Sequence, residues 1–323
     1  MPKVSLQINL SPGDYPHAVH ILPHQLKTLS GQVDEVILTI DTKPSRGRFA
    51  DGWEKYKQHL NRFLATLAQQ NAKVKILPVD YTAEAKAKVA NYFFGTSDMP
   101  DKDYRGGPFY AYFFGLLSAG NNLVFHLDAD IFLGGGSNTW IAEAVALLQE
   151  DATCFTTSPL PGPPHPDDLL IGQSVLKKTA PYTYQFAGMS TRLFLLDRSV
   201  FETEKLKTAR PALRNQLKAI VQGNANANLP ELIISDYMRA SNFHRVDFLG
   251  TNPGLWSLHP PYRTNGFYEK LPQLIHQIEN NQLPDTQQGF YDVVDEVIDW
   301  AEAREALQTK RWWKRILHAK PNQ

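Results

Sequence analysis

Residues 123–133 of this chain read Leu-Val-Phe-His-Leu-Asp-Ala-Asp-Ile-Phe-Leu. The first part predicts a buried strand, and two carboxylates one residue apart follow it directly. Because residues i and i+2 of an extended chain share a face, Asp128 and Asp130 can converge on one ligand. Such a pair suits Mg²⁺ or Mn²⁺, which keep positions open for phosphate oxygens. The alternative is a solvated turn, because Asp-x-Asp pairs also occur by chance.

Strands alternate with helices upstream of this stretch. The apolar runs predict strands, and the helical spacing of apolar residues predicts helices, over these ranges: strands 4–10, 35–40, 74–79 and 123–127; helices 15–30, 52–70 and 108–119. This alternation predicts an α/β fold with a parallel sheet. Ligands of such sheets bind just beyond the carboxyl ends of the strands, where Asp41 and Asp128 fall.

The second half of the chain is less regular. Residues 158–166 hold five prolines and predict a stiff, extended loop, and residues 80–107 predict a longer, less regular segment. The remaining expected elements are strands at 153–157, 194–196 and 245–249, a helix around 141–148, a basic helix near 202–221, a helix from about 230, and amphipathic helices at 267–280 and 290–308.

Composition excludes several classes of protein. The 323 residues contain 33 Lys plus Arg and 33 Asp plus Glu, so the formal net charge is zero and a nucleic-acid partner is disfavoured. The single cysteine, Cys154, excludes an intramolecular disulfide and fits a reducing, cytoplasmic compartment. No run of about 18 apolar residues predicts a membrane-spanning helix.

The chain resembles the GT-A glycosyltransferases, most closely the family 2 type and related nucleotide-diphospho-sugar transferases. The matching segments are Leu6-Gln-Ile-Asn-Leu-Ser11, Leu38-Thr-Ile-Asp41 and His126-Leu-Asp-Ala-Asp130. The resemblance covers about the first 135 residues well and the remainder loosely. It implies a Rossmann-like, mostly parallel sheet sandwiched by helices, with C-terminal helical additions.

The same resemblance implies an organisation and an activity. Residues 1–135 would be the nucleotide-sugar-binding half, 136–265 the acceptor-binding half of the same GT-A domain, and 266–323 a helical extension. The activity would be metal-dependent transfer of a sugar from a nucleotide-diphosphate sugar to an acceptor hydroxyl, with Mn²⁺ or Mg²⁺ as cofactor. The donor sugar and the acceptor (glycan, lipid or small molecule) stay open.

The family pattern also assigns roles to individual residues. Leu10 and Ser11 would line the nucleoside pocket, and Asp41 would accept a hydrogen bond from the base. Asp128 would lie near the ribose or the metal, and Asp130 would bind the metal directly. For Asp41 the alternative is a strand-end residue that opens a turn.

Arg105-Gly106-Gly107 precedes the helix that leads into the 123–127 strand. In the family, a loop at this point approaches the sugar diphosphate. Arginine suits phosphate, and glycine allows close backbone approach, so Arg105 and Gly106 are expected to contact the donor. A plain loop is the alternative.

A late histidine supplies the third metal ligand in many GT-A enzymes. His259, in Leu255-Trp-Ser-Leu-His-Pro-Pro-Tyr262, is the best candidate of the ten histidines. A buried, hydrogen-bonded loop histidine is the alternative. Arg263 follows in the same loop and is expected to reach the phosphates.

An inverting transferase needs a carboxylate base for the acceptor proton. Glu231 and Asp236, in a predicted helix, are the candidates, and Asp236 is favoured because Glu231 beside Pro230 suits the first helical turn. Ordinary helix-end carboxylates are the alternative. The Gln-x-x-Arg-Trp motif of processive family 2 enzymes is missing, so inversion or retention stays open.

The C-terminal residues allow two interpretations. The basic and aromatic residues 310–320 could contact the inner membrane surface peripherally, but packing of their tryptophans is preferred.

A nucleotidyltransferase would share the carboxylates, although the 11–16 turn lacks the basic residue that such enzymes normally carry. A non-catalytic glycan-binding module is the third hypothesis, against which Asp128 and Asp130 count.

Overall fold

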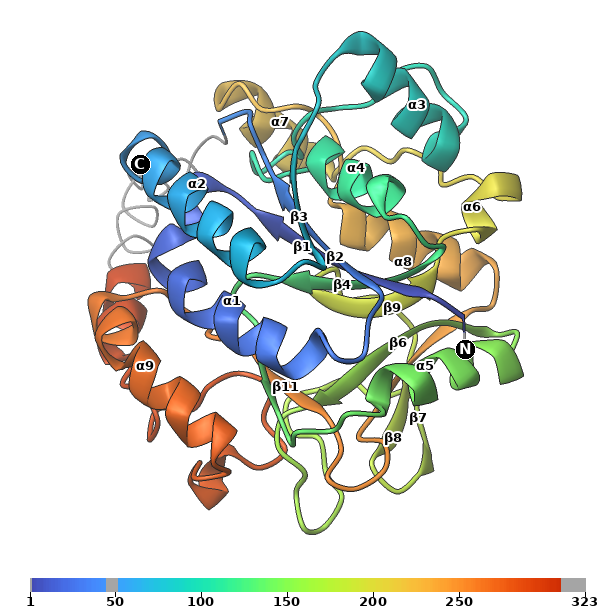
Figure 1. The fold of residues 1–323 in the computed structure, drawn as a ribbon. Helices are drawn as coiled ribbons and strands as arrows, with labels where there is room; N and C mark the ends of the chain where they lie inside the picture. The colour runs from blue at the N-terminus through green and yellow to red at the C-terminus, as the bar shows by residue number, and fades with distance from the viewer. Residues whose placement is uncertain (1, 45–51, 309–323) are drawn as a thin grey trace, which may run out of the picture.

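The computed structural model describes residues 2–44 and 52–308, and within them a central sheet carries helices on both faces (Figure 1). Its strands are β1 (Val4–Leu10), β2 (Glu35–Ile40), β3 (Val74–Pro78), β4 (Leu123–Asp128), β5 (Phe132–Gly134), β6 (Cys154–Pro161), β7 (Lys177–Ala180), β8 (Thr183–Phe186), β9 (Leu193–Asp197), β10 (His244–Phe248) and β11 (Trp256–Leu258). The main path of the sheet runs β3-β2-β1-β4-β9-β6-β10-β8-β7, with β5 and β11 off this path.

The first four strands of this path are parallel, as the alternation of strands and helices predicts. In β1, Leu6 lies between Val36 of β2 and Phe125 of β4. Alternate β1 side chains pack under α1 (Tyr15–Leu29) and α2 (Trp53–Gln70) in one apolar cluster. The opposite face is covered by the cluster that contains α3 (Ala83–Phe94) and α4 (Tyr110–Ser118).

The strand order creates a crevice. From β1 the chain continues to β2 and β3 on one side of the sheet, and then returns to place β4 on the other side of β1. The carboxyl ends of β1 and β4 therefore lie side by side where the winding reverses. Ligands of open α/β sheets bind at this point.

The other half of the sheet is mixed. β9 is antiparallel to both β4 and β6, whereas β10 runs parallel to β6 and antiparallel to β8. The helices of this half of the chain are α5 (Trp140–Glu150), α6 (Val200–Thr203), α7 (Leu213–Val221) and α8 (Pro230–Ala240).

Several local predictions were wrong, each for a tertiary or capping reason. α3 lies in the segment expected to be irregular, where Thr82 caps its start. The helix expected near 202–221 is interrupted, because the Leu206 N–H bonds to Phe93 instead of continuing the helix. β6 runs into the proline-rich stretch, since Pro159 and Pro161 alternate with Leu160, whose N–H bonds to Leu255.

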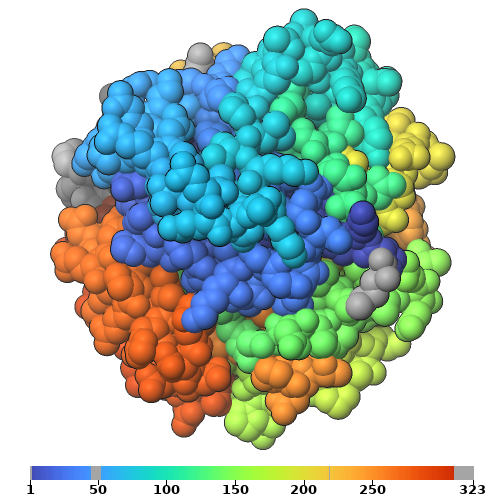
Figure 2. All heavy atoms as spheres, viewed as in Figure 1, coloured from blue at the N-terminus to red at the C-terminus, as the bar shows by residue number. Residues whose placement is uncertain are grey.

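The C-terminal segment packs into the body of the molecule. α9 (Asn265–Glu279) lies against α1, and Glu279 binds both His24 (2.9 Å) and Lys27 (2.5 Å). The two helices also meet at the molecular surface (Figure 2). The helix expected at 290–308 is wrong for its first part: residues 301–308 are helical, whereas Trp300 folds back to donate to the Val293 carbonyl.

None of the described helices is both long and apolar enough to cross a bilayer. The basic and aromatic residues 310–320 lie outside the described residues.

Candidate active site

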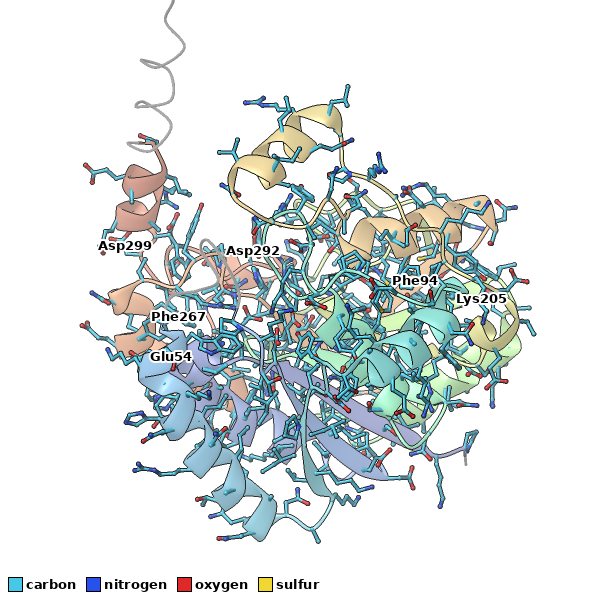
Figure 3. The ribbon with its side chains drawn as sticks, turned by 90° about the horizontal axis from the view of Figure 1, so that it is seen from above. Glu54, Phe94, Lys205, Phe267, Asp292 and Asp299 are labelled. Atoms are coloured by element: carbon cyan, nitrogen blue, oxygen red, sulfur yellow. The ribbon has the colours of Figure 1, made fainter. Side chains whose placement is uncertain are left out.

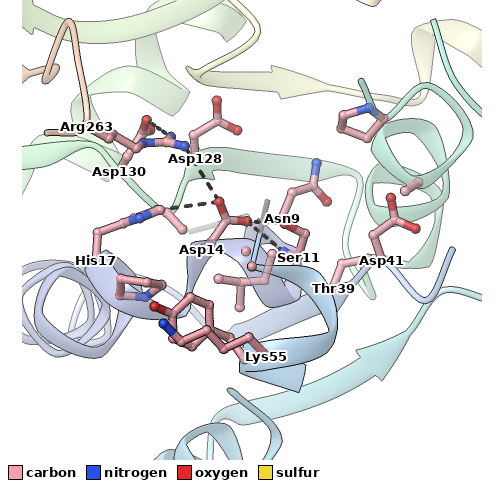
Figure 4. A pocket seen from close by; sticks show the side chains of 18 of the residues that line it. Asn9, Ser11, Asp14, His17, Thr39, Asp41, Lys55, Asp128, Asp130 and Arg263 are labelled. Carbon is pink, nitrogen blue, oxygen red and sulfur yellow. Dashed lines mark hydrogen bonds and ion pairs between the residues drawn. The ribbon is translucent and has the colours of Figure 1, made fainter. Parts of the chain in front are cut away.

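A cavity of about 840 Å³ opens beyond the carboxyl ends of β1, β2 and β4 (Figure 4). Asp128 and Asp130 lie toward one end of it and Asp41 toward the other. Of the residues singled out from the sequence, those that line this donor-side cavity are Leu10, Ser11, Asp41, Asp128, Asp130 and Arg263. The fold therefore brings most of the expected donor site into one place.

The loop that carries Asp128 and Asp130 is held from two sides. The buried Gln25 amide of α1 donates to the carbonyls of Asp128 (2.9 Å) and Ile131 (2.8 Å). The Asp128 N–H donates to the Arg192 carbonyl at 2.7 Å. With its backbone fixed in this way, the loop presents its carboxylates to the cavity without a folding rearrangement.

Asp130 is paired with Arg263. The Arg263 guanidinium donates to the Asp130 carboxylate and also lies 3.9 Å from Asp14. Burial by itself would raise the pKa of Asp130, but the positive charge of Arg263 outweighs burial and holds that pKa well below its ordinary value. Asp130 is therefore an ionised, nearly buried carboxylate whose counter-charge is a side chain from a distant part of the chain.

Asp128 is in a different electrostatic state. Burial raises the pKa of its carboxyl, and the neighbouring His126, whose Nε2 lies 3.4 Å from Oδ1, only partly opposes that rise. The His126 ring is fixed by the Gln7 amide oxygen at 2.5 Å and by stacking on Phe194. The Asp128 carboxylate thus lacks a permanent cation of its own, which leaves it available to a ligand.

The carboxylate oxygens of Asp128 and Asp130 suit a divalent cation that is held only partly by the protein. Within residues 2–44 and 52–308, no three His, Cys, Asp or Glu side chains are grouped closely enough to hold a metal ion by themselves. Two carboxylates in one cavity nevertheless suit Mg²⁺ or Mn²⁺, which are commonly bound through one or two carboxylates together with substrate phosphates and water.

Sequence reasoning missed Asp14, which lies in the middle of the donor-side cavity. It belongs to the short helix η1 (Pro12–Asp14), and its Oδ2 accepts from the Ser11 N–H (2.7 Å) and hydroxyl (2.8 Å). His17, one turn later, points its Nε2 toward Asp14 at 3.6 Å. The Ser-x-x-Asp spacing is a known helix-start signal, so this turn could have been recognised.

Asp41 occupies the opposite end of the cavity, and its carboxylate is already engaged. It accepts from the Tyr81 hydroxyl (2.7 Å), the Lys102 ammonium (2.5 Å) and the Lys43 N–H (3.0 Å). The bond from Lys43 closes the turn after β2, and a strand-end residue that opens a turn was the alternative interpretation of Asp41. Asp41 therefore both shapes the turn after β2 and lines the cavity.

Arg105 and Gly106 do not line the donor-side cavity. Arg105 is exposed, and its guanidinium lies over the Tyr104 ring and donates to that hydroxyl at 3.0 Å. Asp103 organises the turn by accepting from the N–H groups of Arg105 and Gly107. This geometry is that of a plain loop, because its polar groups bond to one another.

A second cavity of about 500 Å³ adjoins the Asp128 loop. Arg192, which holds the Asp128 N–H, lines this cavity together with Glu231 and His259. Pro159, Pro161, Pro261 and Tyr291 supply apolar walls. The hydrogen bond from the Asp128 N–H to the Arg192 carbonyl thus links a residue of the first cavity to a residue of the second.

His259 lines the second cavity, and among the described residues it forms no cluster with Asp128 and Asp130 that could hold a metal ion by itself. Its Nδ1 lies 2.8 Å from an Asp292 carboxylate oxygen, and its ring stacks on Tyr291 with centroids 5.7 Å apart. A carboxylate on one ring nitrogen fixes the orientation of the ring. This is also the hydrogen-bonded loop histidine of the alternative interpretation.

The two candidate bases are placed very differently. Glu231, in the first turn of α8, lines the second cavity. Asp236 lies on the exposed side of the same helix, where it pairs with Arg239, and it lines neither cavity. The geometry therefore favours Glu231 over Asp236, against the preference drawn from the sequence.

Comparisons with known proteins give distant likenesses. No family model and no curated protein matches the chain. Among solved structures, residues 1–349 of S. aureus TarS in complex with UDP-GlcNAc share 12% identity over 84% of this chain and 65% of that chain, with a TM-score of 0.41. The TarS complex with UDP shares 12% identity over 88% of this chain and 68% of that chain, with a TM-score of 0.37.

A UDP-glucose pyrophosphorylase complexed with UDP-glucose is also similar, with 11% identity over 86% of this chain and 99% of that chain and a TM-score of 0.43. The chain spans about two thirds of the length of the TarS structures. Likenesses of this kind concern the arrangement of the sheet and helices alone.

Proposed function

We propose that this protein is a metal-dependent glycosyltransferase that moves a sugar from a nucleotide-diphosphate sugar to an acceptor hydroxyl. One observation carries the proposal: Asp128 and Asp130 line the donor-side cavity at the winding reversal of the sheet, and Asp128 is hydrogen-bonded to Arg192, which lines a second cavity. A transferase needs this arrangement, because donor and acceptor must meet at one reacting centre.

The charges of the donor-side cavity favour a cation-assisted diphosphate. Its lining contains four carboxylates (Asp14, Asp41, Asp128 and Asp130) against Lys55 and Arg263. Because Asp41 and Asp130 are already paired with Lys102 and Arg263, this lining has no surplus of positive charge for a diphosphate. A Mg²⁺ or Mn²⁺ ion held by Asp128 and Asp130 would neutralise the pyrophosphate-type leaving group, and Arg263 would add a further positive charge.

The remaining lining of this cavity suits a nucleoside. Leu10 and Ser11 line it, and so do Tyr56 and Tyr268. Aromatic faces and backbone polar groups are the elements with which proteins bind nucleobases and fix their orientation. The base and the sugar of the donor stay open.

The second cavity is proposed to hold the acceptor. The acceptor oxygen would attack the anomeric carbon as the bond from that carbon to the phosphate oxygen breaks, and the nucleoside diphosphate would leave. Glu231 would receive the proton of the attacking hydroxyl. A base in this role implies inversion at the anomeric carbon, which proton NMR of the early product measures.

The first experiment measures thermal unfolding of the purified protein with UDP, GDP and dTDP, each with and without Mn²⁺ or Mg²⁺. One nucleotide should raise the melting temperature in the presence of metal, since a ligand that binds the folded state stabilises it. Asp130→Asn should abolish the metal-dependent part. Asp236→Asn, the same change at an exposed site outside both cavities, is the matched control.

A nucleotide shift that is equal without metal, or that survives Asp130→Asn, contradicts the site. Release of pyrophosphate from a nucleoside triphosphate and a sugar 1-phosphate would identify a nucleotidyltransferase instead. Stabilisation by oligosaccharides with no response to nucleotides would identify a glycan-binding module.

A further inference from the structure

Helix α7 exposes its large apolar side chains. It stands at the surface, away from the sheet, as the pale yellow helix at the top of Figure 3. Leu213, Leu217, Ile220 and Val221 are 78%, 67%, 67% and 87% exposed. Their spacing of four, seven and eight residues places them on one helical face, which has no partner among the described residues.

The apolar face is directed away from the body of the molecule. Ala219 of the same helix is fully buried, so a small side chain makes the contact with the protein while the large ones face outward. Single exposed leucines are common on protein surfaces, but a continuous apolar stripe usually marks a surface that binds something.

The charge around α7 indicates what that partner is. Residues 205–230 contain five Lys or Arg and no Asp or Glu. Lys207, Arg210 and Arg214 are exposed and form no ion pair with any described residue, whereas Lys205 is committed to backbone carbonyls at its own site. Residues 205–230, the α7 segment, therefore carry only positively charged side chains, in a chain of zero net charge.

We propose that α7 is an interfacial helix that docks this protein on an anionic lipid surface. Its four apolar side chains would enter the boundary between headgroups and acyl chains, and the neighbouring guanidinium and ammonium groups would contact lipid phosphates. The uniform positive charge favours a bilayer over a second copy of the chain, because two such basic segments repel each other.

The α7 segment is fastened to the protein at its two ends. The Leu206 N–H donates to Phe93 (2.8 Å), and the Tyr104 N–H donates to Ala227 (2.9 Å). The latter bond joins the α7 segment to the 103–107 loop, which is followed by Pro108 at the donor-side cavity. Docking through α7 would therefore hold the candidate active site near the lipid surface.

Vesicle co-sedimentation of the full chain tests the proposal without any enzymatic turnover. The protein should bind phosphatidylcholine vesicles that contain about one third phosphatidylserine, bind pure phosphatidylcholine much more weakly, and dissociate as salt is raised. Leu217→Ser with Val221→Ser, and separately Arg210→Ser with Arg214→Ser, should each lower partitioning about tenfold or more.

Two matched variants separate α7 from other surfaces. Leu169→Ser with Leu176→Ser removes exposed apolar side chains elsewhere and should leave binding unchanged. Trp312→Ser with Trp313→Ser tests the C-terminal residues by the same assay. The four substituted residues, Arg210 just before α7 and three within it, are exposed, so unchanged thermal unfolding shows that the fold is intact.

The proposal is overturned if the wild-type chain ignores anionic vesicles, or if binding persists in both α7 variants. It is also overturned if sedimentation velocity shows a dimer that the Leu217→Ser with Val221→Ser variant dissociates, since the apolar face would then bind a second copy.

Discussion

The Arg263 guanidinium, just before α9, donates to the Asp130 carboxylate, just after β4, across 133 residues of chain. This pair joins the segment before α9 to the loop between β4 and β5, and both side chains line the donor-side cavity. It also keeps a nearly buried carboxylate ionised, because the guanidinium lowers its pKa.

Replacing Arg263 by Gln should destabilise the protein by about 2 kcal/mol, since it leaves Asp130 as a buried charge without a partner. Urea unfolding measures the loss. Added Mn²⁺ should restore part of it, and Asp130→Asn in the same chain should restore stability without metal. Equal destabilisation of the single and double variants would contradict this account of the pair.

Glu231→Gln should lower kcat by about two to four orders of magnitude while changing donor KM little, because a general base acts on the transition state. Asp236→Asn, on the exposed side of the same helix, should stay within about twofold of wild type. The measurement is the initial rate of nucleoside diphosphate release from sugar donors that carry the nucleotide identified by thermal unfolding. A larger effect at Asp236 than at Glu231 would reverse the assignment of the base.

Gly134→Ala should destabilise the protein by about 1–3 kcal/mol, because overpacking forces neighbours to shift. A Cβ on Gly134 in β5 would lie 2.0 Å from the Trp256 indole of β11. Thermal unfolding should show the loss, and Trp fluorescence should change with it. Gly31→Ala is the control, since a Cβ there meets nothing within 4 Å and the melting temperature should hardly move.

The sheet of the first half was predictable because its strands are continuous apolar runs separated by amphipathic helices. The position of the donor-side cavity could be predicted from this sheet, because side chains at the carboxyl ends of the strands can be placed without knowing how the loops fold. Helix α3 was missed although Thr82 and Gly95 are readable start and stop signals, with the Thr82 hydroxyl accepting from Ala85.

The second cavity could not be predicted from local patterns. His259, Asp292 and Arg192 come from three loops, and tertiary packing alone brings them together. The β7–β8 hairpin was missed for a similar reason, because Tyr182 takes a left-handed backbone (φ 49°) at its turn where a glycine would have given a signal.

His17 should make the protein less stable in acid. Its ring is 1% exposed, and burial, with a contribution from Arg263, lowers its pKa to about 4. The unfolded chain takes up this proton near pH 6.5 and the folded protein resists it, so stability falls as the pH drops from about 6.5 to 4. A pKa lowered from 6.5 to about 4 corresponds to about 3 kcal/mol.

Urea midpoints at pH 7 and pH 4.5 check this effect. His17→Gln should flatten the pH dependence, whereas His20→Gln, on the exposed part of the same helix, should leave it as in wild type. Identical pH profiles for wild type and His17→Gln would show that His17 does not cause the acid sensitivity.

Cys154 should be unreactive in the native protein. Its side chain is buried in β6, and burial raises the pKa of the thiol to about 12, so hardly any thiolate forms at pH 8. A disulfide reagent such as DTNB should release less than about a tenth of an equivalent of thiolate within minutes, and one equivalent after unfolding in guanidinium. Rapid reaction of the native protein would mean that β6 opens.

The donor-side cavity takes its first wall from β1 and its last from α9, where Asn265 and Tyr268 complete the lining. A nascent chain emerging from the ribosome can thus form the parallel strands early, yet this cavity is not complete until α9 has been synthesised and has packed on α1. A ligand of this cavity can therefore stabilise the fold only after α9 has taken its place.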